Sequence, residues 1–308
     1  MIIGELCALA AALLWSFSPF IFTSAALRIG TLQLNITRSL LATIFLGITL
    51  LIFQININFS LYQIFFLTLS GITGLVLGDT FLFKAFKTIG PRVAMLIMAI
   101  NPAFTAIIAY IWLGESLSII AILGMFLTLI GIAFVILEKP TQEKVKFKIS
   151  ISGVFYGFIA ALGQAVGLIF AKLSNPIKDV PNMLSATFIR LGSAALVLFI
   201  GATLIKKFKN PIILFKNDIP SFKLVVIGSI IGPYLGVTLS FFAIIFTPQA
   251  GIAATLTSIT PILMLPLSRI IYKEKLTWKG ILGAFIAILG VILLFIKDII
   301  NTTFNGSM

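Results

Sequence analysis

Long apolar stretches with almost no charge alternate with short polar gaps along nearly the whole chain. A helix needs about 20 apolar residues to cross a hydrocarbon core of about 30 Å. Ten stretches meet that length, and we expect them at residues 2–24, 32–53, 61–84, 91–113, 117–137, 151–173, 182–205, 220–246, 249–271 and 277–297. The pattern predicts an all-α membrane protein with ten transmembrane helices, and it leaves too little chain for a soluble domain.

Composition supports lipid as the main solvent and excludes several kinds of chemistry. Of the 308 residues, 60% are hydrophobic and 10% charged, and the mean hydropathy is +1.18. A soluble domain carries about 25% charged residues. The chain has no His and a single Cys, Cys7, so it has no Ser-His-Asp or Cys-His pair, no Cys/His zinc site and no intramolecular disulfide. We therefore expect no enzyme activity, no metal and no cofactor.

The net charge of +13 is distributed in a way that is typical of membrane topology signals. Sixteen Lys and Arg residues lie in the odd-numbered gaps between the expected spans, and three lie in the even-numbered gaps and near the termini. The positive-inside rule then predicts that the odd gaps face the cytoplasm and that both termini face outward. We expect the basic runs 144–148 and 206–209 to meet anionic lipid headgroups rather than nucleic acid.

The two halves of the chain repeat one another. Residues 93–138 align with 252–297 with 11 identities in 46 positions, which include Pro102 with Pro261 and Glu115 with Glu274. Further matches pair Arg38 with Arg190, Trp15 with Gln164, Gly74 with Gly232 and Gly78 with Gly236. The predicted organisation is a first repeat at 1–138, a basic connecting loop at 139–150, a second repeat at 151–298 and a polar tail at 299–308.

Each repeat holds five spans, so the second repeat must enter the membrane upside down. The sequence therefore predicts two inverted five-helix repeats. This plan recurs in secondary transporters, whose substrate sites lie near the midplane where the halves meet.

The order and spacing of several motifs resemble tandem EamA domains of the drug/metabolite transporter superfamily, over essentially the whole chain. In the first copy the motifs are Ala85-x9-Met95, Asn101-Pro102, Leu113–Leu117 and Gly124-x6-Gly131; in the second they are Thr260-Pro261, Lys273–Leu276 and Gly283-x6-Gly290. The resemblance implies ten helices and export or exchange of small metabolites without an ATPase. It also implies cytoplasmic termini, opposite to the side that the loop charges predict.

Charged residues inside the bilayer are costly and so are candidates for function. Asp79 is the strongest candidate, for substrate binding or for coupling to protons or Na⁺. The alternative to a functional role is that Asp79 forms a structural pair with Lys84 or Arg38, or that it is solvated at the membrane interface. Arg38 and Arg190 are candidate gates or anion contacts, although we favour anchoring at the headgroups through long side chains. Glu115 and Glu274 are expected to cap helices.

Polar and helix-breaking residues give the remaining candidates. Pro102 and Pro261 are predicted to interrupt the fourth and ninth spans at matched positions, which marks a possible hinge or binding site. In addition to Asp79, the candidate substrate-binding residues are Trp15, Ser16, Asn101, Gln164, Tyr234, Thr238 and Thr260. Helix packing is the alternative for each of them. The Gly124/Gly131 and Gly283/Gly290 pairs are expected to allow close packing within the chain.

Together these features predict a multi-pass secondary transporter of the cytoplasmic (inner) membrane that exports a small metabolite, such as an amino acid, by alternating access. Proton coupling through Asp79 would supply the energy. The alternatives are an uncoupled facilitator, or a membrane enzyme or lipid-handling protein with a buried polar site. Expected partners are the small-molecule substrate and membrane lipid, with no nucleic acid, and the chain is expected to be a monomer or a homodimer.

Overall fold

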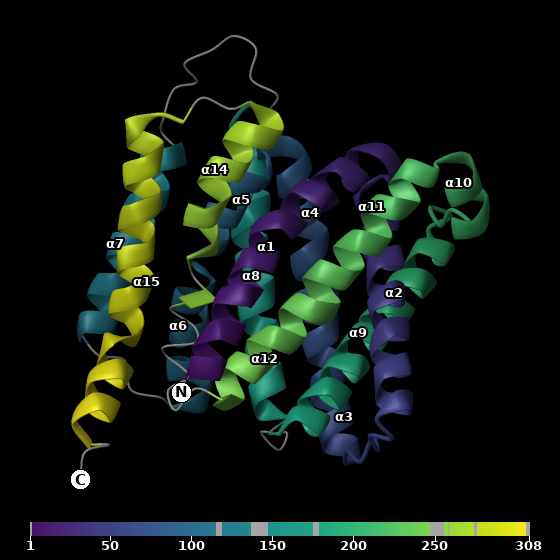
Figure 1. Ribbon diagram of the computed structural model, residues 1–308, viewed down its shortest axis with the longest axis horizontal. Coiled ribbons are helices and arrows are strands. Elements are labelled where there is room, and N and C mark those ends of the chain that lie inside the picture. The colour runs from purple at the N-terminus through teal and green to yellow at the C-terminus, as the bar shows by residue number, and fades with distance from the viewer. Residues whose placement is uncertain are drawn as a thin grey trace.

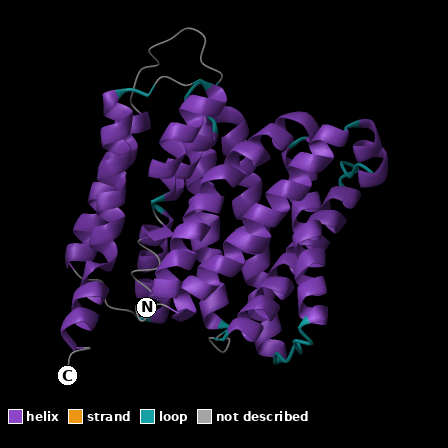
Figure 2. Cartoon of the chain, in the orientation of Figure 1, coloured by secondary structure: helices purple, strands orange, loops and turns teal. Residues whose placement is uncertain are grey.

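A computed structural model describes residues 2–114, 119–136, 147–174, 179–246, 256–257, 259–273 and 276–305. This part of the chain forms helices joined by short turns, and no β-strand occurs in it (Figure 2). The predicted all-α class is therefore confirmed. Glu115, Glu274 and residues 139–146 of the predicted connecting loop lie outside the described residues.

The helices of the first half follow one another with short connections. They are α1 (Ile2–Ile29), α2 (Thr31–Ile52), α3 (Leu61–Ser70), the π-helix η1 (Gly71–Gly78), α4 (Asp79–Ile89), α5 (Pro91–Met98), α6 (Asn101–Leu113) and α7 (Ile119–Ile136). The segment from Leu61 to Ile89 is one continuous rod, because α3, η1 and α4 join without a turn.

The described helices of the second half follow a similar order, with the short helix α10 added. It comprises α8 (Ile151–Leu173), α9 (Val180–Leu204), α10 (Pro211–Asn217), α11 (Ile219–Ser229), the π-helix η2 (Ile230–Gly236), α12 (Val237–Phe246), α14 (Thr260–Tyr272) and α15 (Trp278–Asn305). The short helix α10 lies in a gap where the hydrophobic pattern predicted none. Asn210 caps the start of α10: its side chain accepts a hydrogen bond from the backbone N–H of Ile212.

Seven helices of the described part are long and apolar enough to cross a membrane, and three shorter apolar helices occupy other expected spans. The chain is thus a multi-pass membrane protein. The exact number of ten spans and the inverted relation of the halves stay predictions. In Figure 1 the start of α1 and the end of α15 lie at the same end of the bundle, and α10 lies at the opposite end.

Three span ends differ clearly from the predicted ones. The first helix, α1, continues to Ile29 instead of ending at 24. The third span continues to Ile89 instead of ending at 84, so Asp79 lies deeper in its helix than the sequence suggested. The last helix, α15, continues to Asn305, so residues 299–305 of the predicted polar tail are helical. Polar residues extend a helix at little cost once an apolar segment has formed it, because propagation is easier than nucleation.

Pro102 and Pro261 coincide with breaks in the chain, as predicted. The fourth span divides into α5 and α6 at Ala99 and Ile100, and Pro102 lies in the first turn of α6. Pro261 likewise lies in the first turn of α14. Both prolines are tolerated there, because in the first turn of a helix the missing N–H removes no intrahelical hydrogen bond. Each proline starts a new helix rather than bending an existing one.

The α7–α15 pair lies side by side at one edge of the bundle (Figure 1). A Cβ atom at Gly131 would lie 2.3 Å from the backbone nitrogen of Ala287, and one at Gly290 would lie 2.4 Å from that of Thr128. Thr128 also donates to the carbonyl of Ala287 across the interface, at 3.3 Å. The predicted close packing of these glycines within the chain is confirmed.

Replacing Gly290 by Ala should lower the stability of the purified protein by about 1–3 kcal/mol, since the added methyl group must push α7 and α15 apart. Thermal unfolding in detergent measures this loss. Gly201→Ala in α9 is the matched control, because a Cβ at Gly201 meets nothing within 4 Å. The control should be as stable as the parent or slightly more stable. Equal effects of the two substitutions would contradict the packing described here.

At the end of the bundle that contains α10, an ion pair links the two halves. Arg28 in the last turn of α1 lies 3.4 Å from Asp218, which caps the start of α11. Asp218 also accepts hydrogen bonds from the hydroxyl and the backbone N–H of Ser221, and these bonds hold the pKa of its carboxyl below the usual value. The pair is exposed and contributes little to stability.

Candidate functional site

Asp79 is the centre of the candidate site. It begins α4 directly after the π-helix η1, ten residues before the end of the rod at Ile89, which corresponds to roughly 15 Å along a helix. Its side chain is 5% exposed. The sequence has no other Asp or Glu between Glu5 and Glu115. A buried carboxylate at this depth needs partners, and the structure provides them from both halves of the chain.

Arg38 of α2 forms a buried ion pair with Asp79 through its Nη2 atom. The same nitrogen donates to the Asn35 side-chain oxygen at 3.3 Å, and the guanidinium lies over the rings of Phe22 and Phe83, at 5.5 and 5.1 Å from their centroids. Anchoring of Arg38 at the headgroups, which the sequence favoured, is therefore wrong. The buried carboxylate attracts the guanidinium inward, where aromatic faces also stabilise the cation.

Lys84 is the alternative partner that the sequence proposed for Asp79. Its ammonium group instead lies 4.7 and 5.6 Å from the ring centroids of Phe81 and Tyr156. The structural pair thus involves Arg38.

Gln164 of α8 brings the second half of the chain to Asp79. Its Nε2 donates to the carboxylate at 2.8 Å. The approach depends on the glycines that flank Gln164: a Cβ at Gly163 would lie 3.1 Å from the Cα of Gly78, and one at Gly167 would lie 2.8 Å from the Cα of Gly74. Small residues on both helices let α8 and η1 come close enough for the amide to reach.

Arg190 of α9 is the second arginine near Asp79. Its Nη2 lies 3.9 Å from the position that a Cβ at Gly74 would take, and its charge interacts with that of Asp79. The Nε atoms of Arg190 and Arg38 are both buried, and neither has a hydrogen-bond partner in the part of the chain that the structure describes. The four residues Arg38, Asp79, Gln164 and Arg190 are here called the charged cluster. It carries two positive groups and one negative group.

The two helix breaks each contact the first helix of the other half. Asn101, at the start of α6, donates through Nδ2 to the carbonyl of Ala161 in α8 at 3.0 Å. Thr260, at the start of α14, donates to the carbonyl of Ala12 in α1 at 3.5 Å and to that of Thr257 at 2.7 Å. The sequence repeat aligns Asn101 with Thr260 and Ala161 with Ala12, so these contacts are equivalent between the halves.

Trp15 and Ser16 lie on α1, away from the charged cluster. The indole nitrogen of Trp15 packs against Gly236, where a Cβ would lie 2.4 Å from it. Gln164 makes the corresponding contact with Gly78 in the other half. Ser16 is fully buried and donates to the carbonyl of Leu13 at 2.7 Å. Packing therefore accounts for the contacts of Trp15 and Ser16.

Tyr234 and Thr238 lie on η2 and α12. The Tyr234 hydroxyl is 2.8 Å from that of Thr49, and its ring packs against Phe45. Thr238 donates to the carbonyl of Tyr234 at 2.6 Å, which satisfies a backbone group of the π-helix. Of the sequence candidates, Arg38, Asp79, Gln164 and Arg190 are thus brought together, and Tyr234 and Thr238 belong to a separate contact between α2 and η2.

Sequence reasoning missed Asn35 and the two π-helices. Asn35 donates to the carbonyl of Leu75 at 2.9 Å and to the Thr80 hydroxyl at 3.0 Å, and it accepts a bond from Arg38. It fixes the end of η1 relative to α2. Its position one helical turn before Arg38 in an apolar span is a signal that could have found it.

The π-helices occupy matched places in the two halves. η1 ends at Gly78 and η2 ends at Gly236, which the sequence repeat aligns. π-Helical turns are rare and are frequent at functional sites, because the extra residue re-aims the side chains that follow. In the first half the side chain that follows is Asp79.

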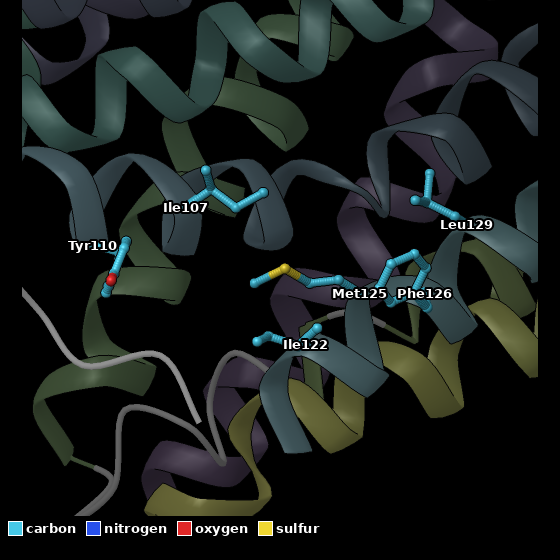
Figure 3. A pocket seen from close by; sticks show the side chains of 6 residues that line it. All are labelled: Ile107, Tyr110, Ile122, Met125, Phe126 and Leu129. Carbon is cyan, nitrogen blue, oxygen red and sulfur yellow. The ribbon is translucent and has the colours of Figure 1, made fainter. Parts of the chain in front are cut away.

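A pocket of about 470 Å³ lies between α6 and α7 and is lined by Ile107, Tyr110, Ile122, Met125, Phe126 and Leu129 (Figure 3). Figure 3 shows these side chains directed toward a shared space from the two helices. None of them carries a charge and none is a sequence candidate. Among these lining residues only Tyr110 has a polar side-chain group, so the lining offers little to orient a polar substrate.

The fold and the site together define a multi-pass helical membrane protein whose two halves meet at a buried ion pair. The family model of the EamA-like transporter family matches the chain twice, over residues 2–137 and 151–296, and the chain belongs to that family. The resemblance inferred from the sequence motifs is thereby confirmed.

Two comparisons with individual proteins cover nearly the full length. An uncharacterized transporter of Archaeoglobus fulgidus is 22% identical over 297 residues, which cover 96% of this chain and 98% of the relative. A solved structure, whose title says only that it is the crystal structure of a protein, matches with a TM-score of 0.63 at 16% identity. That match covers 97% of this chain and 98% of the solved chain, and it supports the fold.

Proposed function

We propose that this protein is a secondary transporter that exports a small metabolite, such as an amino acid, across the cytoplasmic membrane by alternating access. The observation that carries the proposal is the charged cluster. Its carboxylate is bonded by Arg38 from the first half of the chain and by Gln164 from the second. Relative movement of the halves must change the bond from Gln164, which joins them, so the cluster is a place where ligand binding and conformation can be linked.

The equivalent contacts of Asn101 and Thr260 support the same mechanism. Each ties a helix break in one half to the first helix of the other half. Single hydrogen bonds of this kind contribute about 0.5–1.5 kcal/mol and can be exchanged during a transition between states. We therefore infer that the breaks before Pro102 and Pro261 act as hinges while the halves rock around the cluster.

Asp79 is proposed as the coupling residue. A proton on its carboxylate would remove the charge that holds Arg38, and the ion pair would open. Protonation and the position of Arg38 are thereby coupled, which is what a proton-driven transporter requires. An uncoupled facilitator would use the same cluster for binding alone.

A tolerance screen in a bacterial host tests the proposal. Cells that overproduce the protein, cells with an empty vector and cells with the Asp79→Asn form are challenged with toxic amino acids, their analogues, nucleosides and cationic drugs. We expect tolerance to one chemical group in the first strain only, accompanied by faster release of that compound from preloaded cells. No tolerance and no release for any compound in the panel would contradict an exporter of these metabolites.

A further inference from the structure

We infer that the substrate carries a carboxylate group and that Arg190 binds it. This inference deepens the proposed function and rests on it, because it names the chemistry of the transported molecule. It starts from the charges of the cluster and from the hydrogen bonds that its members make.

The charged cluster has one carboxylate for two guanidinium groups. Asp79 accepts hydrogen bonds from Arg38 and Gln164, so both carboxylate oxygens already have a donor. Among the described residues, nothing accepts a hydrogen bond from the Arg190 guanidinium, and its Nε is buried. A cation without a bonded counter-ion in a region of low dielectric is costly. An anionic ligand would supply the missing acceptor.

The repeat shows that the second half lacks a carboxylate at the position equivalent to Asp79. Arg190 is the equivalent of Arg38, but the residue aligned with Asp79 is Val237, which directly follows η2 as Asp79 directly follows η1. Between Val180 and Lys273 the sequence has a single Asp or Glu, Asp218. Asp218 is bonded to Ser221 and Arg28 at the end of α1. Arg190 therefore has, in its own half, no carboxylate at the position that corresponds to Asp79.

The chemistry of the guanidinium favours a carboxylate as the missing partner. Arginine presents a planar fork of donors that matches the two oxygens of a carboxylate, whereas Lys offers only a point charge. The nearby Asp79 disfavours ligands with a high negative charge and can accept an ammonium group. An amino acid or an organic acid with a free carboxylate fits this arrangement.

Thermal unfolding of the purified protein in detergent tests the inference without requiring transport. The probes are alanine and malate, each compared with its amide, alaninamide and the diamide of malic acid. We expect at least one of the two carboxylates to raise the unfolding temperature and its amide to have no effect. Arg190→Gln should weaken the apparent affinity about tenfold to hundredfold, the loss expected for a hydrogen bond to a charged group. The apparent affinity of Arg190→Lys should fall between those of the parent and of Arg190→Gln.

Two further readouts separate ligand binding from a structural role. Without ligand, Arg190→Gln should be at least as stable as the parent, because it removes a partly buried charge whose Nε has no hydrogen-bond partner among the described residues. Arg269→Gln is the matched control: Arg269 is exposed at the end of α14, and its replacement should leave the carboxylate effect unchanged.

Three results would overturn the inference: no stabilisation by either carboxylate, the same affinity in Arg190→Gln as in the parent, or a marked loss of stability in ligand-free Arg190→Gln. Failure of the proposed function gives a different result. Carboxylates would then bind through Arg190, but proteoliposomes would move none of them. Transport of compounds without a carboxylate, and of no others, would keep the proposed function and reject this inference.

Discussion

Accumulation of substrate driven by an imposed proton gradient should disappear when Asp79 is replaced by Asn. Asparagine keeps the size of the side chain but has no titratable carboxyl group, so the Arg38 bond no longer responds to protonation. The effect is measured in proteoliposomes that carry a pH difference across the membrane and are supplied with the compound found in the tolerance screen. Asp79→Glu keeps a titratable carboxyl and should retain part of the accumulation.

The design must separate coupling from folding. Asp79→Asn leaves two arginines without a carboxylate, whereas the double variant Arg38→Gln/Asp79→Asn has the same net cluster charge as the parent. Loss of accumulation in both variants is therefore expected. Asp179→Asn is the matched control, because Asp179 caps α9 outside the cluster and Asn caps helices about equally well. Full accumulation in the Asp79 variants would make Asp79 a structural residue.

Asp79→Asn should also be the least stable single variant of the cluster. Removing one partner of a buried ion pair costs about 3–5 kcal/mol, because the other charge stays buried without compensation. Here the loss leaves two positive groups together. Arg38→Gln should cost clearly less, since Asp79 keeps its bond from Gln164 and the nearby charge of Arg190. Unfolding of the ligand-free proteins in detergent gives the ranking.

The double variant provides the internal check of this ranking. If the cluster is unbalanced toward positive charge, adding Arg38→Gln to Asp79→Asn should recover part of the lost stability. A purely additive loss, or an Arg38→Gln protein less stable than Asp79→Asn, would show that the arginines are compensated elsewhere. The same outcome would weaken the argument that Arg190 awaits an anionic ligand.

The hydrophobic pattern predicted most helix positions well because length and apolarity suffice for that purpose. The span 151–173 coincides with α8, and 91–113 coincides with the α5–α6 segment. Matched prolines and glycines predicted the helix breaks and the α7–α15 contact, since the covalent restriction of proline and the missing Cβ of glycine act locally. Helical extension to Ile89 and Asn305 was missed, because no apolar signal marks those turns.

The sequence by itself determined the helical membrane character, the repeat and the family, and it singled out Asp79 as the strongest candidate for function. It left open which residue pairs with Asp79, and it favoured a headgroup anchor for Arg38. Only the tertiary structure decided that Arg38 turns inward, that Gln164 crosses from the other half, and that Arg190 has no bonded partner among the described residues. The physical reason is that a buried charge is satisfied by whichever groups packing brings within about 3 Å, and such contacts join helices far apart in the chain.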